Sequence, residues 1–329
     1  MRKILITGGA GFVGRHFCKH FLDQGDQVHC VDALVKDTGG LDCALWPFFN
    51  PGAYKNFHFY RQDCRDYFKE NTDDDFDYSL HLAAMVGGRM MIENDPLAVA
   101  CDLSIDAEYW RWALKARPKK TVCFSSSAAY PVALQRENNW CLLKEDMISL
   151  GDNIGKPDMS YGWAKLTSEY LARLAHEKYG LKSVIYRPFS GYGEGQDDNY
   201  PFPSICKRAL DLKGSPVFQV WGTGEQMRDF IHIDDCVRGV LMTMDLIDDA
   251  QAVNLSTGIL TSFKSFAAMA AEICGHKPLI IGMSDKPSGV FARGGDISKQ
   301  RALGFIPGID FKSGIIKALE YYQKKPWTR

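Results

Sequence analysis

The sequence has 329 residues and a formal net charge of −1, with acidic and basic residues mixed along it. This length buries a large core, in one large domain or two intimate ones, and the balanced charge argues against nucleic-acid or membrane-surface partners. No apolar run approaches the ~20 residues that span a bilayer. The first apolar run begins at residue 4, so we expect no signal peptide. Ten cysteines without zinc spacing predict reduced thiols, a cytoplasmic protein and no metal site.

The first fourteen residues carry the strongest local pattern. Residues 4–6 form an apolar run typical of a strand buried on both faces, and residues 15–23 form an amphipathic helix pattern. Three glycines lie between or just inside them: Gly8, Gly11 and Gly14. The first allows a tight turn, the second lets backbone approach a pyrophosphate, and the third lets the helix pack closely. The N–H groups at the helix start, near Phe12 and Val13, would bind the anion, so this unit predicts dinucleotide binding.

Acidic residues follow the next two expected strands. Residues 27–31 form a strand pattern that ends in Asp32, where a carboxylate would accept from the adenosine ribose hydroxyls and repel a 2′-phosphate. Asp32 therefore favours NAD over NADP, and a solvated aspartate at a strand end is the alternative. Asp63 and Cys64 follow the strand pattern of residues 57–60, and we expect Asp63 to accept from the adenine amino group. The stretch 34–56 is long for a connection, and we expect a short helix or a contact surface there.

Strand and helix patterns continue to alternate. Further strands are expected at 78–84 and 121–125, and helices at 96–115 and at 161–179. This alternation predicts an α/β fold with a doubly wound parallel sheet. The fourth strand ends in Leu82, Ala83 and Ala84, whose small alanine side chains would let backbone lie against the cofactor.

Tyr161 and Lys165 are four residues apart, so they share one face of the last of these helices. An ammonium there stabilises a phenolate, which lets the tyrosine exchange a proton with a substrate. A serine hydroxyl from the end of the fifth strand would complete the hydrogen bonds around a substrate hydroxyl. A solvated helix face is the alternative, but the position after the fifth strand favours acid–base chemistry.

The chain resembles the extended short-chain dehydrogenases/reductases, in their NAD-dependent nucleotide-sugar epimerase and dehydratase group. The resemblance rests on the motifs above, and further on the serine run 125–127, on 187–188, on 228–235 and on 293–299. It implies an NAD-binding Rossmann domain at residues 1–186, to which 228–258 returns, and a smaller α+β substrate domain at 187–329. It also implies NAD, a nucleoside-diphosphate sugar carrying GDP or UDP, and a homodimer.

The resemblance also assigns roles to single residues. Ser126, with Ser127 as the alternative, becomes the catalytic hydroxyl, Tyr161 the acid/base, and Lys165 the group that orients the cofactor ribose. Arg228 and Arg293 would clamp the substrate diphosphate, which suits planar guanidinium groups, with a structural ion pair as the alternative. The remaining assignments are Pro188 for the cofactor and Gly87, Gly88, Arg89, Ser127 and Asn199 for the substrate.

Departures from the family pattern narrow the reaction. The 4,6-dehydratases carry an Asp-Glu pair where this chain has Ser127 and Ala128, so elimination lacks its acid and base. Residues 83–88 and 220–222 resemble GDP-mannose 3,5-epimerase and GDP-L-fucose synthase, which use a cysteine at the place of Ala128. Asp102 and Ser190 stand near where the family usually has asparagine. What remains is epimerisation at C4 through a 4-keto sugar, as in UDP-galactose 4-epimerase. A 4-ketosugar reductase, a C4 dehydrogenase and a non-catalytic sensor are the alternatives.

Overall fold

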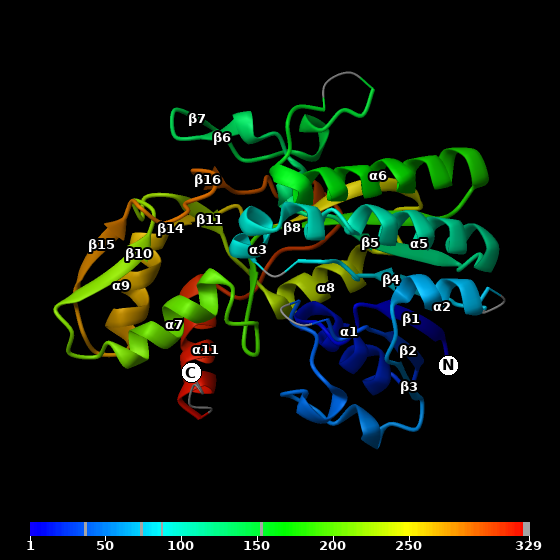
Figure 1. Cartoon of the computed structure of the whole chain (residues 1–329), viewed down its shortest axis with the longest axis horizontal. Coiled ribbons are helices and arrows are strands. Elements are labelled where there is room, and N and C mark those ends of the chain that lie inside the picture. The colour runs from blue at the N-terminus through cyan, green and yellow to red at the C-terminus, as the bar shows by residue number, and fades with distance from the viewer. Residues whose placement is uncertain (36–37, 73–74, 87, 152–153, 325–329) are drawn as a thin grey trace. The chain divides into compact units, whose positions relative to one another are not determined.

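The structure is a computed structural model, and it describes residues 1–35, 38–72, 75–86, 88–151 and 154–324 (Figure 1). The chain divides into two compact units of three segments each. The first unit comprises Met1–Ala129, Pro157–Arg187 and Val240–Val253, and the second comprises Tyr130–Lys156, Pro188–Gly239 and Asn254–Arg329. The expected division near residue 186 lies one residue from a segment boundary. The returning stretch differs from the expected 228–258, and residues 130–156 leave the first unit because they bond to residues 291–296.

The first unit is built on a parallel sheet. Within the described residues it has seven strands in the order β13-β8-β5-β4-β1-β2-β3. The pairs from β3 through to β8 are all parallel, as expected for strands joined by crossover helices. The doubly wound α/β prediction is therefore confirmed. The strands are β1 (Lys3–Thr7), β2 (Gln27–Val31), β3 (Phe57–Tyr60), β4 (Tyr78–His81), β5 (Lys120–Phe124), β8 (Ser183–Pro188) and β13 (Asp249–Leu255).

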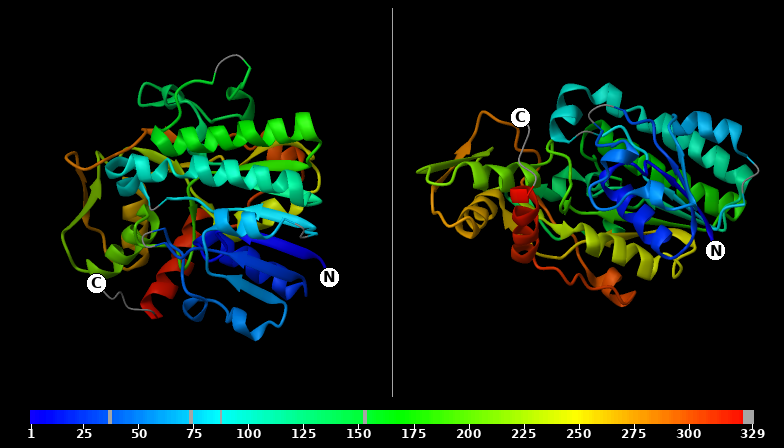
Figure 2. Two further views of the ribbon diagram at one scale, coloured as in Figure 1. Left: turned by 45° about the vertical axis from the view of Figure 1, so that its right-hand side comes forward. Right: turned by 90° about the horizontal axis from the view of Figure 1, so that it is seen from below.

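Helices cover both faces of this sheet. Alternate residues of β5 show the two faces, because Cys123 packs with α2, α5 and α6, whereas Phe124 meets Phe17 of α1 at 5.6 Å between ring centroids. Figures 1 and 2 show α5 and α6 side by side on one face. The helices are α1 (Phe12–Asp23), α2 (Cys64–Glu70), α3 (Arg89–Asn94), α4 (Pro96–Val99), α5 (Asp102–Ala116) and α6 (Met159–Tyr179). A further helix, α8 (Ile233–Thr243), contains the boundary between the segments of the two units.

The helix expected at 96–115 is interrupted, which corrects that prediction. The Cys101 N–H bonds to the Ala98 carbonyl three residues back, at 3.1 Å, and this tighter turn separates α4 from α5. Short 3₁₀ helices occur at Cys43–Leu45, Pro51–Ala53, Ser127–Ala129, Val132–Leu134 and Glu145–Met147. Across the described ranges, no helix is both long enough and apolar enough to cross a membrane.

The second unit combines small sheets with helices around an aromatic core. Phe230 stacks on Phe311 with ring centroids 4.5 Å apart, and Phe266 packs at 4.9 Å from Phe311. This is the expected α+β architecture. Its strands are β6 (Gln135–Arg136) with β7 (Asn139–Trp140), β9 (Gly191–Tyr192) with β12 (Ile231–His232), β10 (Val217–Trp221) with β15 (Leu279–Met283), and β11 (Met227–Asp229) between β14 (Leu260–Ser262) and β16 (Ala292–Arg293). Its helices are α7 (Pro201–Asp211), α9 (Phe263–Ile273), α10 (Ser298–Ala302) and α11 (Phe311–Lys324).

Candidate active site

The glycine turn after β1 lies beside the end of β4, where the strand order of the sheet reverses. Gly8 has φ of +69°, and a Cβ on it would lie within 2.8 Å of the backbone of Leu82 and Ala83. A Cβ on Gly14 would overlap the backbone of the turn itself, so the helix packs directly on the turn. A Cβ on Gly11 would meet, among the described residues, only the Gly8 carbonyl oxygen, at 3.3 Å. The Gly11 side of the turn therefore has room for a ligand.

The start of α1 fits the pyrophosphate of a dinucleotide. Phe12 and Val13 begin the helix directly after Gly11, and no described side chain caps it and no acidic residue stands in its first turn. The N–H groups of this turn are thus available to an anion, which the helix dipole also favours. Ala84 is half-buried beyond the end of β4 and leaves the neighbouring backbone uncovered by a long side chain.

Asp32 follows β2, and its carboxylate holds two backbone groups. Oδ2 accepts from the Ala10 N–H at 3.0 Å in the glycine turn, and Oδ1 accepts from the Leu34 N–H at 2.9 Å. Burial raises the pKa of Asp32, against the lowering effect of these two bonds and of the Arg15 guanidinium. Each oxygen keeps a lone pair for a ribose hydroxyl, and that role stays a prediction. The support that Asp32 gives to the turn was missed by sequence reasoning.

Asp63 is the N-cap of α2. It accepts from the Arg65 N–H at 2.8 Å and from the Arg65 side chain at 3.0 Å through Nε and 2.6 Å through Nη2. The hydrogen bond with this side chain lowers the pKa of Asp63. Cys64 is the buried first residue of α2, and burial raises the pKa of its thiol to about 12. Both carboxylate oxygens thus have a partner already, and the adenine contact stays a prediction.

The serine run after β5 offers three different hydroxyls. Ser125 is buried and donates to Glu169, which also accepts from Arg187 Nε at 2.8 Å and Nη2 at 2.6 Å. Ser127 is buried at the start of a 3₁₀ turn. Ser126 is half-buried, and its hydroxyl accepts from the backbone N–H two residues further on at 3.1 Å. Ser126 is therefore the most exposed serine of the run, and its catalytic role stays a prediction.

Tyr161 and Lys165 lie on α6, whose start packs on the serine turn. A Cβ on Gly162 would overlap the Ala128 carbonyl oxygen, which also accepts from the Asp158 N–H at 3.0 Å. Glycine at 162 thus lets the beginning of α6 approach the turn that carries the serines. The Lys165 Nζ lies 5.8 Å from the centroid of the Tyr161 ring. Tyr161 is half-buried, whereas Lys165 is only 5% exposed.

Two carboxylates are buried on α5 near Lys165. Asp102 and Asp106 are 1% and 2% exposed and stand one helical turn apart. Asp106 Oδ1 pairs with His81 Nε2 at 3.0 Å, and Asp102 Oδ1 accepts from the Met85 N–H. The Oδ2 atom of each carboxylate has no hydrogen-bond partner among the described residues.

These buried charges act on one another. Burial lowers the pKa of Lys165, but the negative charges of Tyr161, Asp102 and Asp106 outweigh burial and raise it. Burial raises the pKa of Asp102 to about 6, against the attraction of Lys165. Burial lowers the pKa of His81, so this ring is neutral at neutral pH. Lys165 is therefore a permanent cation beside an acid that titrates near neutrality, and sequence reasoning predicted only the cation.

Arg89 begins α3 and is held by two carboxylates. Its Nε lies 2.5 Å from Glu93, and its Nη1 lies 3.1 Å from Asp158, which precedes α6. Gly88 before it has φ of +81°, a conformation that favours glycine. Gly87 lies outside the described residues. The substrate contacts predicted for this segment stay predictions.

Arg228 and Arg293 meet in the second unit. They lie on the parallel strands β11 and β16, in which they are direct register partners. Because register partners on neighbouring strands point to the same face, the two guanidinium groups share one side of this small sheet. The structure thus brings together two residues that are far apart in the sequence.

Neutral acceptors orient both arginines. Arg228 Nη1 donates to the carbonyls of Met227 and Val290 at 2.8 and 2.9 Å, and Arg293 Nε donates to Gln135 Oε1 at 2.6 Å. Gln135 is 1% exposed, and its Nε2 donates to the carbonyls of residues 130 and 131 at 3.2 and 3.1 Å. These bonds fix which end of the amide faces Arg293. Sequence reasoning missed Gln135, because nothing in its local pattern indicates this distant partner.

Asn199 and Pro188 stand apart from this pair in the described contacts. Asn199 is exposed just before α7, and its N–H bonds to Asp197 Oδ1 at 2.8 Å. Pro188 is the half-buried last residue of β8. Their roles in binding substrate and cofactor stay predictions.

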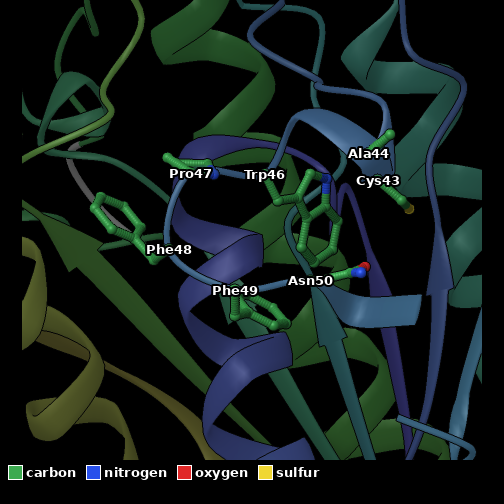
Figure 3. A pocket seen from close by; sticks show the side chains of 7 residues that line it. All are labelled: Cys43, Ala44, Trp46, Pro47, Phe48, Phe49 and Asn50. Atoms are coloured by element: carbon green, nitrogen blue, oxygen red, sulfur yellow. The ribbon is translucent and has the colours of Figure 1, made fainter. Parts of the chain in front are cut away.

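A hollow of about 480 Å³ occurs in the long connection between β2 and β3 (Figure 3). Trp46 and Phe49 meet edge to face there at 5.3 Å, and the hollow carries none of the residues discussed above. It is lined by Cys43, Ala44, Trp46, Pro47, Phe48, Phe49 and Asn50. The connection holds two short 3₁₀ helices, as expected, and the contact surface expected there stays a prediction.

Known proteins resemble this chain along nearly its whole length. The sequence model of the NAD dependent epimerase/dehydratase family matches residues 4–256. An uncharacterized UDP-glucose epimerase of Bacillus subtilis is 28% identical over 97% of this chain and 97% of its own length. GDP-mannose 3,5-epimerase of Arabidopsis thaliana is 26% identical over 95% of this chain and 80% of its own length.

The solved structures include a similar protein of the same size. UDP-glucose 4-epimerase of Thermotoga maritima, crystallised with UDP-glucose, aligns with a TM-score of 0.82 at 26% identity. The alignment covers 98% of this chain and 99% of that chain. The likeness therefore includes the segments of both units.

Proposed function

Because this chain belongs to the NAD-dependent epimerase/dehydratase family, we propose that it inverts C4 of a UDP-sugar through a transient 4-keto sugar. It is an NAD-dependent epimerase or a related oxidoreductase. The observation that carries the proposal is the pair on α6, where Lys165 lies 5.8 Å from the Tyr161 ring and the helix start packs on the serine turn. The pair belongs to the unit that carries the glycine turn, which supports an acid/base role for Tyr161 beside bound NAD.

The residues of the first unit divide the chemistry between them. When bound at the glycine turn, NAD supplies the hydride acceptor and later the donor. Tyr161 takes the proton of the sugar C4 hydroxyl in the first half of the cycle and returns it in the second. Lys165 stabilises the phenolate by its charge, and the Ser126 hydroxyl hydrogen-bonds the reacting oxygen. The same three side chains therefore serve both directions of the reaction.

The second unit supplies the anchor for the substrate. Arg228 and Arg293, side by side on β11 and β16, would hold the diphosphate by charge-assisted bonds. An anchor on the diphosphate leaves the 4-keto sugar free to turn about its linkage. That turn presents the opposite face of C4 and so accounts for inversion with no further acid or base.

Product analysis tests this function. The purified protein is extracted for bound NAD and incubated with UDP-glucose, with GDP-mannose in a parallel reaction. We expect bound NAD, a stable mixture of UDP-glucose and its C4 epimer, and no build-up of NADH. Build-up of NADH in step with substrate use would indicate a C4 dehydrogenase instead. Protein that holds NAD but converts neither sugar contradicts the proposal.

Cofactor choice has its own measurement. Asp32 would repel a 2′-phosphate, so NAD should raise the melting temperature and NADP should have little effect at equal concentration. Comparable stabilisation by both cofactors contradicts the role given to Asp32.

Two properties of the whole protein are also proposed. Trp163 and Tyr170, seven residues apart on α6, are 45% and 47% exposed, and this shared apolar face supports a homodimer. Light scattering after size-exclusion chromatography tests the homodimer, and a monomer at micromolar concentration contradicts it.

All ten cysteines are free thiols and six are buried, which supports a reducing, cytoplasmic location.

A further inference from the structure

A buried carboxylate stands beside the proposed acid/base pair without a complete set of partners. Asp102 is 1% exposed, its Oδ1 accepts from the Met85 N–H, and its Oδ2 has no hydrogen-bond partner in the described part of the chain. Such a group is costly to bury unless a charge compensates it. Lys165, itself buried on the facing helix α6, is the cation that lowers the cost.

We propose that Asp102 is a positioning residue that acts on Tyr161 through Lys165. When Asp102 is ionised, its charge offsets that of the Lys165 ammonium. When Asp102 is protonated, the full charge of the ammonium acts on Tyr161. The inference rests on the proposed function only in taking Tyr161 and Lys165 as the acid/base pair. It concerns the proton balance of the site and is independent of the sugar that binds.

The other groups around Lys165 do not compete for this role. Asp106 has a side-chain hydrogen-bond partner in His81 at 3.0 Å, and burial keeps both the His81 ring and the Cys123 thiol neutral at neutral pH. Glu169 is neutralised by Arg187 at 2.6 Å. The titratable groups facing the cluster are Asp102 and Asp106 from α5, His81 from β4, Cys123 from β5, and Tyr161 and Glu169 from α6. Asp102 differs from Asp106 and Glu169 because, among the described residues, its one hydrogen bond comes from a backbone N–H.

The effect on Tyr161 has a definite sign. An ionised Asp102 offsets the charge of the Lys165 ammonium, which would otherwise stabilise the phenolate, and so opposes phenolate formation. Because burial raises the pKa of Asp102 to about 6, a fall in pH through that value removes the opposing charge. Protonation of Asp102 thus makes a second proton harder to place on Tyr161, as in other coupled sites.

Asp102→Asn separates charge from hydrogen bonding. The asparagine Oδ1 still accepts from the Met85 N–H, while the negative charge is lost. The readout is the ultraviolet absorbance of tyrosinate against pH, with and without NAD, taken as the difference between each protein and its own Tyr161→Phe partner. We expect the midpoint of Tyr161 ionisation to move to lower pH by roughly one pH unit. The acidic limb of kcat/KM should move in the same direction.

Matched variants separate this role from a structural one. Asp102→Glu keeps the charge and should leave the midpoint near that of the natural protein, whereas Asp102→Ser, a second way to remove the charge, should lower it. A lower melting temperature with an unchanged midpoint, or a midpoint moved to higher pH, overturns the proposal. Because the titration needs no substrate, it gives its answer even if no nucleotide sugar is turned over.

Discussion

The two units hold their functional cations in contrasting ways. In the first unit, Lys165 is 5% exposed beside buried carboxylates, of which Asp102 and Asp106 each keep one oxygen without a hydrogen-bond partner among the described residues. In the second unit, carbonyl and amide oxygens fix Arg228 and Arg293 in direction. Lys165 thus keeps its charge beside a carboxylate that can change its protonation, whereas Arg228 and Arg293 are held in direction by neutral acceptors. The contrast follows the chemistry assigned to each unit.

Removing the proton carrier Tyr161 should give the largest effect on activity, and it tests the surroundings of Lys165. Tyr161→Phe should lower turnover by roughly 10²–10⁴-fold, because acid/base help is lost while packing is kept. Nucleotide-sugar binding and NAD binding should stay near normal. Steady-state kinetics with binding titrations check this, and Tyr170→Phe on the exposed side of α6 is the control. Natural turnover in Tyr161→Phe would show that another group moves the proton.

Asp102 should give the next largest effect, seen in stability against pH. The pKa of Asp102 in the folded state, about 6, lies above its ordinary value of 3.8, so the folded state keeps the proton to a higher pH than the unfolded state does. The contribution of Asp102 to stability therefore falls as pH rises through this window. Between pH 4 and 7, the free energy of unfolding of Asp102→Asn should gain roughly 2 kcal/mol over that of the natural protein.

Urea unfolding at several pH values measures this difference. The exposed Asp66→Asn on α2 is the control and should show no such divergence. Parallel pH curves for Asp102→Asn and the natural protein would mean that the buried carboxylate is not strained by ionisation.

The arginine pair of the second unit is tested by removing each guanidinium group. Arg228→Ala and Arg293→Ala should each weaken binding of a nucleoside diphosphate by roughly 10- to 100-fold, the worth of one or two hydrogen bonds to a charged group. NAD affinity should not change, because the cofactor pyrophosphate is expected at the glycine turn of the other unit. Calorimetric titration into the NAD-bound protein measures both affinities.

Two controls sharpen this test. Lysine at either position should restore binding only in part, since a point charge cannot reproduce the guanidinium fork. The exposed Arg136→Ala should bind as the natural protein does. Unchanged affinity in both alanine variants would place the diphosphate elsewhere.

Gln135 gives the smallest expected effect and asks whether orientation alone matters. Gln135→Met keeps the length of the side chain but loses the bond to Arg293, so diphosphate binding should weaken by about 2- to 10-fold. Asn139→Ala removes an exposed side-chain hydrogen bond, made by an amide in the same hairpin, and serves as the control. Equal affinity in Gln135→Met and Asn139→Ala would mean that Arg293 needs no orienting partner.

Local patterns predicted most of the first unit. The strands expected at 27–31 and 57–60 match β2 and β3 residue for residue, because apolar runs ended by polar residues are read within a short window. The helix expected at 96–115 was predicted less well, since a single tightened turn at Cys101 breaks it without a proline or glycine to mark the place. The strands β8 and β13, which end the sheet on one side, were not located, because their partners lie far along the chain.

The residues of the candidate site also divide into those that local patterns predicted and those that they did not. The glycine turn and the Tyr161–Lys165 spacing are local patterns, so both were found directly. The pairing of His81 with Asp106, the orientation of Arg293 by Gln135 and the capping role of Asp63 were not found. Each depends on which polar groups become buried together, and a short window of sequence does not contain that information.

The division of the chain into interleaved segments governs how the protein emerges from the ribosome. The sheet of the first unit is complete only with β13, which ends at Leu255, so it waits while much of the second unit is synthesised. Until then β8 presents an open strand edge, a known site of wrong pairing. Nascent chains are synthesised at about 5–20 residues per second, so the edge of β8 stays unpaired for several seconds. Translation speed and chaperone access over this interval thus matter to the yield of native protein.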